Sequence, residues 1–395
     1  MLISEIIKKE VFTATRNFGF LIYPFVLPLP IPLKWKSIAL FIFIFSLASS
    51  VNFNKFDTKQ VFKEPVVLLS AILFLLDPIL SLIRDNFIYI NDVRLSLILM
   101  PLLFLLGGNV LRKRQENILK CFVLGVFIYI FYAMAFCAHF YIQNKTSNAF
   151  ELNYYLKYVL YHHLPGAIHH TYMGAFIIFS SSLLYWEKRI NLIIRVLGIF
   201  LLSASIFILG SKMSIALFFF VPLFSLLSTK KTFDKKWGVI SGGMLLLFSF
   251  CGLWFLLKTD LFRNFSNSAI NRISLFEGSF ILIKDNFMLG IGNYNIKEQL
   301  IQYSSDKVSG MDTHNVFLQE FLSNGVFGFL ILTLLFSFFF LRSIGDHIYL
   351  LFVIVFLFIG TIEHILNLQL GVTFFLFFSY LFYFSANPKL DVNES

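Results

Sequence analysis

Charged residues are scarce in this chain. Lys, Arg, Asp and Glu make up 14% of its 395 residues, whereas hydrophobic residues make up 58%. A soluble globular protein of this composition would have too little polar surface to cover itself. Apolar runs of about 20 residues, the length that crosses a bilayer as a helix, recur along almost the whole chain. The scarcity of charge therefore excludes a soluble globule and predicts an integral membrane protein.

Cysteine is rare, and strict alternation of polar and apolar residues is missing. The three cysteines, Cys121, Cys137 and Cys251, show no paired spacing, so neither a disulfide framework nor a thiolate metal site is indicated. A transmembrane barrel would alternate along each strand, whereas this chain sustains runs such as LILTLLFSFFFL. We therefore predict an all-α, polytopic membrane protein with a single transmembrane domain over residues 1–395.

Hydropathy predicts about twelve transmembrane helices. The count falls to eleven if the first segment, which contains four prolines, is kinked or lies at the interface. The start shows no short apolar region followed by a small-residue cleavage site, so we expect no removable signal peptide. The predicted spans are 17–33, 37–53, 65–83, 95–110, 121–142, 170–186, 190–209, 213–228, 237–257, 325–341, 347–361 and 369–385.

The basic residues indicate the orientation. The loops on the side of the membrane that holds the N-terminus contain more than twice as many Lys and Arg residues as the short loops on the other side. This imbalance predicts that both termini are cytoplasmic. This bias accounts for much of the net charge of +10, so nucleic-acid binding is not needed to explain that charge. The basic residues lie in short clusters beside the predicted spans. Two long loops, 143–169 and 258–324, then lie outside, and the second connects spans nine and ten.

The loop 258–324 is expected to be helical and to lie at the membrane edge. In NRISLFEGSFILIKDNF, Ile273, Phe280 and Phe287 belong to a stripe at helical spacing, and Arg272 lies at its edge. Arg272 is therefore predicted to face protein or headgroups; an arginine that snorkels to lipid phosphate is the alternative. The glycines of the following MLGIGNYN predict a helix end and a tight turn.

A histidine follows at the start of the next helix. Asp312 or Thr313 is the expected N-cap, which places His314 in the first helical turn, on the inward face. The helix N-terminus and nearby cations would keep its imidazole neutral, as a general base requires. A histidine that only caps or orients the loop is the structural alternative.

A further cation lies in LGSKMSIAL, where Lys212 is predicted at the outer surface. A snorkelling lysine is again the alternative. Together, Lys212, Arg272 and the helix end carrying His314 would form a cationic pocket with one neutral base. A lipid-linked diphosphate would fit such a pocket.

These segments resemble the O-antigen ligase and polymerase family of bacterial membrane glycosyltransferases. LGSKMSIAL, the arginine helix through NYN, THNVFLQEFLSNGVFG and IEHILNLQLGVTFFLFF follow in the order expected of that family, over roughly residues 205 to 386. The first half resembles the family mainly through hydropathy and through HHTYMG.

The resemblance implies transfer of a glycan from undecaprenyl diphosphate to an acceptor sugar hydroxyl, such as one of the lipid A core. The reaction would take place on the periplasmic face of the bacterial inner membrane. His314 would deprotonate the acceptor, while Arg272 and Lys212 would bind the diphosphate. Many relatives carry arginine at the position of Lys212, and lysine loses the bidentate geometry. We expect an inverting reaction without metal or other cofactor, since two fixed cations can stabilise the leaving phosphate.

Other polar residues are weaker candidates. His169, His170, Tyr172, Asn315 and Glu363 are candidate substrate contacts, with structural hydrogen bonding as the alternative. His162 and His163 complete two histidine pairs in one outer loop, but their spacing does not favour zinc.

Two rival functions remain. A polymerase would use the same fold and chemistry but add the glycan to another repeat unit. A lipid-linked sugar flippase or transporter belongs to another class and would predict an internal repeat and charges near the middle of the bilayer. The chain shows no such repeat, and most of its charges lie at the ends of spans.

Overall fold

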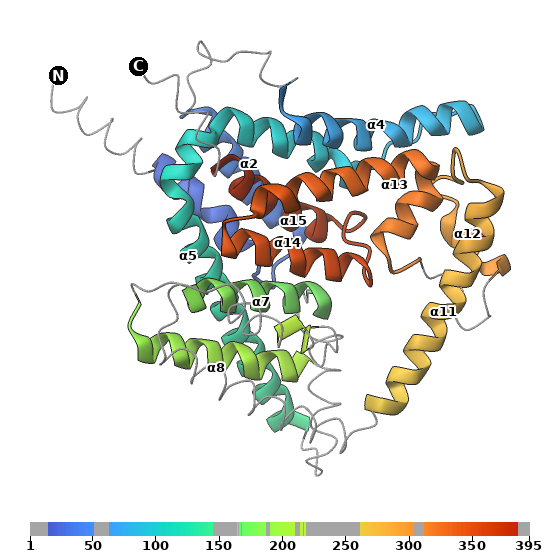
Figure 1. Ribbon diagram of the computed structural model, residues 1–395. Helices are drawn as coiled ribbons and strands as arrows, with labels where there is room; N and C mark the ends of the chain where they lie inside the picture. The colour runs from blue at the N-terminus through green and yellow to red at the C-terminus, as the bar shows by residue number, and fades with distance from the viewer. Residues whose placement is uncertain are drawn as a thin grey trace. The chain divides into compact units, whose positions relative to one another are not determined.

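In the computed structural model, the regular elements among the described residues are helices, and no strand occurs among these residues (Figure 1). The all-α prediction is therefore confirmed for this part of the chain. The described residues are 15–50, 63–144, 164, 166, 168–186, 190–209, 214–215, 217–218, 261–303 and 312–385.

Contacts divide the chain into two compact units. Unit 1 comprises Met1–Thr58, Leu102–Phe218 and Phe377–Ser395, and unit 2 comprises Lys59–Pro101 and Phe219–Leu376. Two helices, α5 (Ser96–Asn144) and α15 (Gln369–Ser385), contribute residues to both.

Phenylalanine holds unit 1 together. Besides its parts of α5 and α15, the unit contains α2 (Leu33–Ala48), α7 (His170–Trp186) and α8 (Leu192–Leu209), and α7 packs against α8. The Phe377 ring lies 5.1 Å from the rings of Tyr23 and Phe43 and 5.3 Å from that of Phe104, measured between centroids. Such edge-to-face contacts stabilise a core beyond the burial of apolar area alone.

Unit 2 is built around α13 (Val316–Ser343). This helix packs against α4 (Pro65–Asp85), α14 (His347–Gly360) and α11 (Leu261–Asp285), and α11 also packs against the short helix α12 (Ile296–Tyr303). A single turn of 3-10 helix, η2 (Asp92–Leu95), precedes α5.

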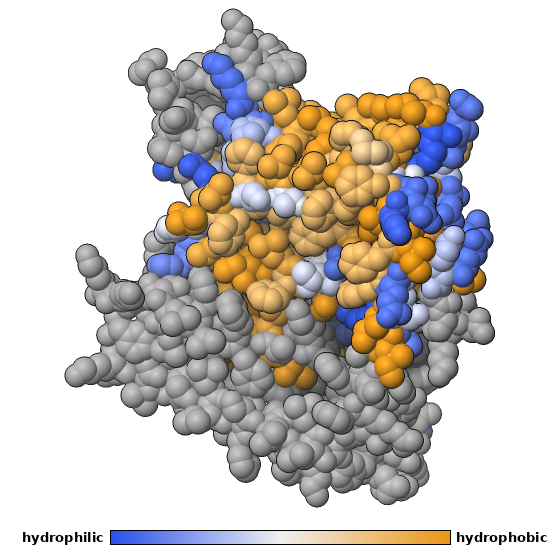
Figure 2. All heavy atoms as spheres, turned by 45° about the vertical axis from the view of Figure 1, so that its right-hand side comes forward, coloured by the Kyte–Doolittle hydropathy of each residue, from blue (hydrophilic) through white to orange (hydrophobic). Residues whose placement is uncertain are grey.

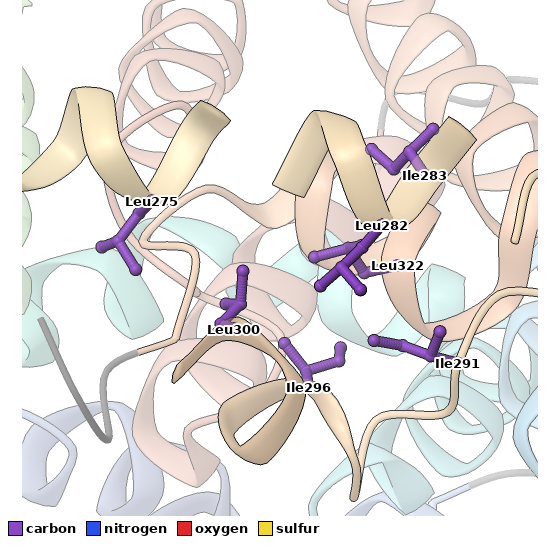
Figure 3. Packing of buried hydrophobic residues seen from close by; sticks show 7 residues of the cluster. All are labelled: Leu275, Leu282, Ile283, Ile291, Ile296, Leu300 and Leu322. Atoms are coloured by element: carbon purple, nitrogen blue, oxygen red, sulfur yellow. The ribbon is translucent and has the colours of Figure 1, made fainter. Parts of the chain in front are cut away.

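A small apolar cluster joins the helices of the segment 261–303 to α13 (Figure 3). The side chains that point into it come from α11, from the loop after it, from α12 and from α13. Each buried side chain of this size contributes about 1.5–3 kcal/mol relative to an exposed one. Its members are Leu275, Leu282, Ile283, Ile291, Ile296, Leu300 and Leu322.

Among the described residues, three helical stretches are long and apolar enough to cross a membrane: Pro65–Asp85, Asp92–Gln143 and Val316–Ser343. Leu192–Ile206, His347–Gly360 and Gln369–Ser385 are shorter apolar helices. Most of the predicted span 213–228 and all of 237–257 lie outside the described residues. The count of about twelve spans and the periplasmic placement of the loop stay predictions.

One expected boundary is absent. A break was expected between the spans 95–110 and 121–142, but α5 runs without interruption from Ser96 to Asn144. The intervening LRKRQEN is rich in residues with high helix propensity and contains no glycine or proline, so nothing in it ends a helix.

Large apolar side chains are exposed on the surface. Along α4, Ile72, Leu75, Ile79, Leu82 and Ile83 are each more than 40% exposed. Figure 2 shows that apolar surface extends beyond α4: on the face in view the described residues are mainly hydrophobic, and hydrophilic ones lie mostly toward its left and right margins. Contiguous apolar surface of this kind is what a lipid-facing protein presents.

Candidate active site around His314

Asn315 caps the N-terminus of α13. Its side-chain oxygen accepts hydrogen bonds from the backbone N–H groups of Phe317 and Leu318, at 2.9 and 3.0 Å. Its side-chain amide donates to the carbonyl of Thr361, which follows α14. Both ends of the Asn315 side chain are therefore occupied in positioning the helix start.

His314 precedes Asn315, the N-cap of α13, and therefore does not lie in the first helical turn. Its φ of 47° places it in the left-handed region, which residues with a side chain rarely adopt. The Asp312 carboxylate accepts a hydrogen bond from the N–H of His314 at 3.2 Å, and the Thr313 hydroxyl accepts one from the N–H of Asn315 at 3.3 Å. The expected N-cap at Asp312 or Thr313 is therefore wrong, because both side chains stabilise this turn instead.

Two carboxylates face the imidazole of His314. Its Nδ1 lies 3.7 Å from Oε2 of Glu363 and 3.8 Å from Oδ1 of Asp312. Both separations exceed the length of a hydrogen bond, so the carboxylates act on the ring mainly through their charge. Because Glu363 follows α14 and Asp312 precedes α13, the two helices bring together residues far apart in sequence.

This arrangement overturns the expected electrostatics. Glu363 raises the pKa of His314 and Asp312 adds to the effect, whereas burial and the charge of Arg272 lower it; the net direction is upward. We expected a helix end and cations to lower the pKa, and that expectation is wrong because the nearest charged groups are negative. The ring is therefore a stronger base than an isolated imidazole.

A second histidine lies behind Asp312. His364 is almost fully buried, and its Nδ1 lies 3.4 Å from Oδ2 of Asp312. Burial lowers the pKa of His364 to about 4, with Arg94 and His314 adding to the effect and the carboxylates opposing it. At neutral pH His364 is therefore uncharged, and Asp312 lies between one neutral imidazole and the more basic ring of His314.

Arg272 reaches the same region from α11. It is half-buried, and it lies close enough to His314 for its charge to lower the pKa of that ring. Ile273 and Phe280 of the predicted stripe are more than half exposed, whereas Leu275, Leu282 and Ile283 are buried in the apolar cluster. The cluster therefore fixes the helix that carries the guanidinium.

The glycine-rich turn after α11 docks onto a break in α13. At Gly325 the backbone has φ 62° and ψ −159°, which interrupts the helix. The carbonyl groups of Leu322 and Ser323 instead accept hydrogen bonds from the N–H groups of Ile291 and Gly292, at 2.7 and 3.1 Å. A Cβ at Gly290 would come within 2.5 Å of the Leu322 oxygen, so the close approach requires glycine there.

Arg84 reinforces this junction from the end of α4. Its guanidinium donates to the carbonyl groups of Leu289 and Gly290, at 3.1 and 3.2 Å. The same side chain forms an ion pair with Asp85 at 2.7 Å. The turn is thereby held against both α4 and α13.

A buried ionic group lies deeper in unit 2. Arg94 is fully buried and donates to both carboxylate oxygens of Glu320, and its Nη1 lies 3.2 Å from Oδ2 of Asp77. Asn324 donates to both of these carboxylates, at 3.0 Å to Asp77 and 3.2 Å to Glu320. Asp77 of α4 therefore faces an arginine from another element.

Amide side chains connect this ionic group to the His314 loop. Arg94 donates to Oδ1 of Asn367 at 2.9 Å, and Asn367 in turn donates to Oδ1 of Asn293 at 2.7 Å. Gln319 also donates to Asn293, at 2.9 Å, and accepts from the Thr313 hydroxyl at 3.0 Å. A continuous chain of hydrogen bonds therefore runs from the buried arginine to the residue next to His314.

Sequence reasoning missed this network, although a signal was present. The letters QEFLSN place four polar residues inside the first turns of an otherwise apolar helix. Gln319, Glu320, Ser323 and Asn324 are all nearly fully buried. Buried polar groups require hydrogen-bond partners. The pattern therefore predicts that other polar side chains pack against this part of the helix, and Arg94 is a cation that could be one of them.

The other predicted site residues divide as follows. Lys212, His162 and His163 lie outside the described residues. His169, His170 and Tyr172 belong to unit 1, where the rings of the two histidines lie 4.3 Å apart between centroids. His314, Arg272, Asn315 and Glu363 all belong to unit 2.

Within the described part of the chain, no group of three or more His, Cys, Asp or Glu side chains is arranged to hold a metal ion. The expectation of a metal-free site stays a prediction.

Part of the chain matches a known protein family. Residues 197–333 match a family model described as O-antigen ligase, a segment that contains Lys212, Arg272 and His314. The match ends before Glu363 and before the IEHILNLQLGVTFFLFF segment, which the predicted resemblance had included. A search of curated proteins finds no match.

Proposed function

We propose, on the premise that residues 197–333 belong to the O-antigen ligase family, that this membrane protein is a glycosyltransferase with His314 as its general base. The donor is a glycan linked to undecaprenyl diphosphate, and the acceptor is a sugar hydroxyl, for which the lipid A core is the first candidate. The reaction takes place at the periplasmic face of the inner membrane.

One observation carries this proposal. His314 and Glu363, from segments widely separated in sequence, face each other near the N-terminus of α13, and Arg272 of α11 is near enough for its charge to act on the His314 ring. A base beside a guanidinium is the minimum that this reaction needs, since the acceptor must lose a proton while the diphosphate gains charge.

The reaction balances with these residues. The acceptor oxygen forms a bond to the anomeric carbon of the donor as its proton moves to His314. The bond between that carbon and the phosphate oxygen breaks, and its electron pair leaves with the diphosphate. Arg272 neutralises the growing negative charge. Attack opposite the leaving group inverts the anomeric centre.

Lys212 is proposed as a second cation on the diphosphate. This role rests on the family resemblance, since Lys212 lies outside the described residues. Direct substrate contact through His169, His170 or Tyr172 likewise rests on the sequence.

Reconstitution of the full chain into vesicles tests the proposal. The donor is lipid-linked glycan extracted from the cells that make the protein, and lipid A core is supplied or omitted in the presence of a chelator. Glycan attached to lipid A core would identify a ligase, and a longer glycan on the lipid carrier would identify a polymerase. Movement of the glycan across the bilayer without a new glycosidic bond would overturn the proposal in favour of a transporter.

A further inference from the structure

The two ring nitrogens of His314 have different surroundings. Nδ1 is buried, faces Glu363 and Asp312 at 3.7 and 3.8 Å, and has no hydrogen-bond partner among the described residues. The His314 side chain as a whole is nevertheless 33% exposed. The carboxylates therefore lie on the Nδ1 side, and the exposed part of the ring lies elsewhere.

Asp312 makes three contacts that fix this geometry. It holds the His314 backbone through the N–H of that residue, it faces His314 Nδ1 with the same oxygen, and its other oxygen faces Nδ1 of His364. Movement of this one carboxylate would therefore change both the backbone turn and the surroundings of the ring.

The buried His364 fixes Asp312 in turn. A neutral imidazole carries its proton on one nitrogen, and a carboxylate beside Nδ1 favours the proton there. In that tautomer the Nδ1–H of His364 points to Asp312, and Nε2 is an acceptor that is buried without a hydrogen-bond partner among the described residues. His364 therefore restrains Asp312 without carrying a charge of its own.

We propose that Asp312 and Glu363 are positioning residues that hold the proton of neutral His314 on Nδ1, so that Nε2 accepts the proton of the acceptor hydroxyl. The catalytic role of Nε2 rests on the proposed function. The position of the proton on the imidazole does not depend on it. During transfer the acceptor O–H bond breaks and the proton binds Nε2, which forms an imidazolium. The two carboxylates stabilise that positive charge through Nδ1–H.

Other charged groups around the ring act in the opposite direction. Arg272 approaches from α11, and its charge opposes the imidazolium. His364, from the turn after α14, is neutral at pH 7, and the fully buried Arg94 helps to keep it so. Glu363 and Asp312 are therefore the groups whose removal should lower the pKa of His314.

The test measures the titration of His314 in the full chain. The protein is labelled with ¹⁵N-histidine and placed in lipid nanodiscs, and the signals of its eight histidines are followed by NMR from pH 5 to 9. His314→Gln identifies the resonance by its loss. We expect the free ring to carry its proton on Nδ1, and we expect Glu363→Gln and Asp312→Asn each to move the midpoint to lower pH.

Glu298→Gln is the matched control, since it removes one exposed carboxylate of unit 2 that no described contact joins to the ring. It should leave the midpoint unchanged, and Glu363→Asp, which keeps the charge, should move it less than Glu363→Gln. An unchanged midpoint in both Glu363→Gln and Asp312→Asn, or a proton on Nε2, would overturn the inference. A variant that lowers thermal stability without moving the midpoint would show a merely structural carboxylate and would also overturn it.

Activity separates this inference from the proposed function. If the chain transfers glycan, Glu363→Gln should lower the maximal rate by roughly a hundredfold through misplacement of the base, and the acid limb of the rate profile should move to lower pH with the NMR midpoint. If the midpoint moves but intact protein transfers no glycan, the positioning stands and the proposed reaction fails.

Discussion

His314 combines an uncommon backbone conformation with a polar environment. A residue with a side chain in the left-handed region costs roughly 1–2 kcal/mol, and here the hydrogen bond to Asp312 offsets part of that cost. Backbone strain of this kind gathers at functional sites when the surrounding structure holds it in place. The conformation therefore supports a role for His314 beyond packing.

Arg272 should be required for binding of the diphosphate. Arg272→Gln removes one charge-assisted contact, which is worth about 1.5–3 kcal/mol, so affinity for undecaprenyl diphosphate in nanodiscs should fall roughly tenfold to a hundredfold. Arg272→Lys should lose less, because it keeps the charge without the bidentate geometry.

Lys284→Gln is the matched control for this measurement, because Lys284 is an exposed cation in the last turn of the same helix. Equal affinity of Arg272→Gln and the intact chain would remove Arg272 from the diphosphate site.

At this scale the sequence singled out candidate residues, whose roles stay predictions, but it did not reveal their charged partners. His314, Arg272 and Glu363 were all singled out, because a histidine at a helix start and an arginine on an amphipathic helix are visible in local patterns. The pKa of His314 was predicted in the wrong direction, because its partner Glu363 lies in a distant segment. Pairings of that kind depend on how helices pack, which no local pattern encodes.

At the scale of the element, the break in α13 should depend on glycine. The backbone angles at Gly325 lie in a region that is essentially limited to glycine, and a Cβ there would overlap the carbonyl oxygen of Met288. Gly325→Ala should therefore lower the midpoint of thermal unfolding, by a strain of roughly 1–3 kcal/mol together with the loss of the docked turn.

Gly345→Ala separates strain from overlap. Gly345 also has a positive φ, of 104°, but a Cβ there meets no atom within 4 Å. It should destabilise the protein less than Gly325→Ala does. Equal losses in the two variants would show that the contact with Met288 contributes nothing.

The buried ionic group should stabilise unit 2 only while it is complete. Arg94→Met leaves the carboxylates of Glu320 and Asp77 buried without their cation, which typically costs about 3–5 kcal/mol. The midpoint of thermal unfolding should fall accordingly, and a second change, Glu320→Gln, should restore part of it. The exposed Lys297→Met, which also removes one cation from unit 2, should have little effect. An Arg94→Met protein as stable as that control would contradict this account of the network.

The helices themselves were predicted well where a single apolar run has clear ends. The span 170–186 coincides with α7, and 369–385 coincides with α15. The span 325–341 begins at the break in α13, but the helix starts earlier, at Val316, because its first turns are polar and buried against partners that hydropathy does not detect. The charged residues between the predicted spans 95–110 and 121–142 suggested that a helix ends within α5. Such residues are common at the membrane interface, but they are equally compatible with a continuous helix.

At the scale of the whole molecule, the orientation in the membrane is a prediction from the basic residues. In a chain whose three cysteines are replaced by alanine, Glu298→Cys on α12 should react with an impermeant thiol reagent added outside intact cells. Ile344→Cys, between α13 and α14 and 61% exposed, should react only after the membrane is permeabilised. The reverse pattern would place the His314 loop on the cytoplasmic side and contradict a periplasmic site.

The rate of glycan transfer by the reconstituted full chain tests the central claim most directly, with intact protein, His314→Ala and His347→Ala compared under one set of conditions. His347 is an exposed histidine at the start of α14 and serves as the matched control. A general base contributes about 10²–10⁴-fold, so His314→Ala should lose activity in that range while His347→Ala keeps the rate of the intact chain. Equal rates for all three proteins would contradict the assignment of His314 as the base.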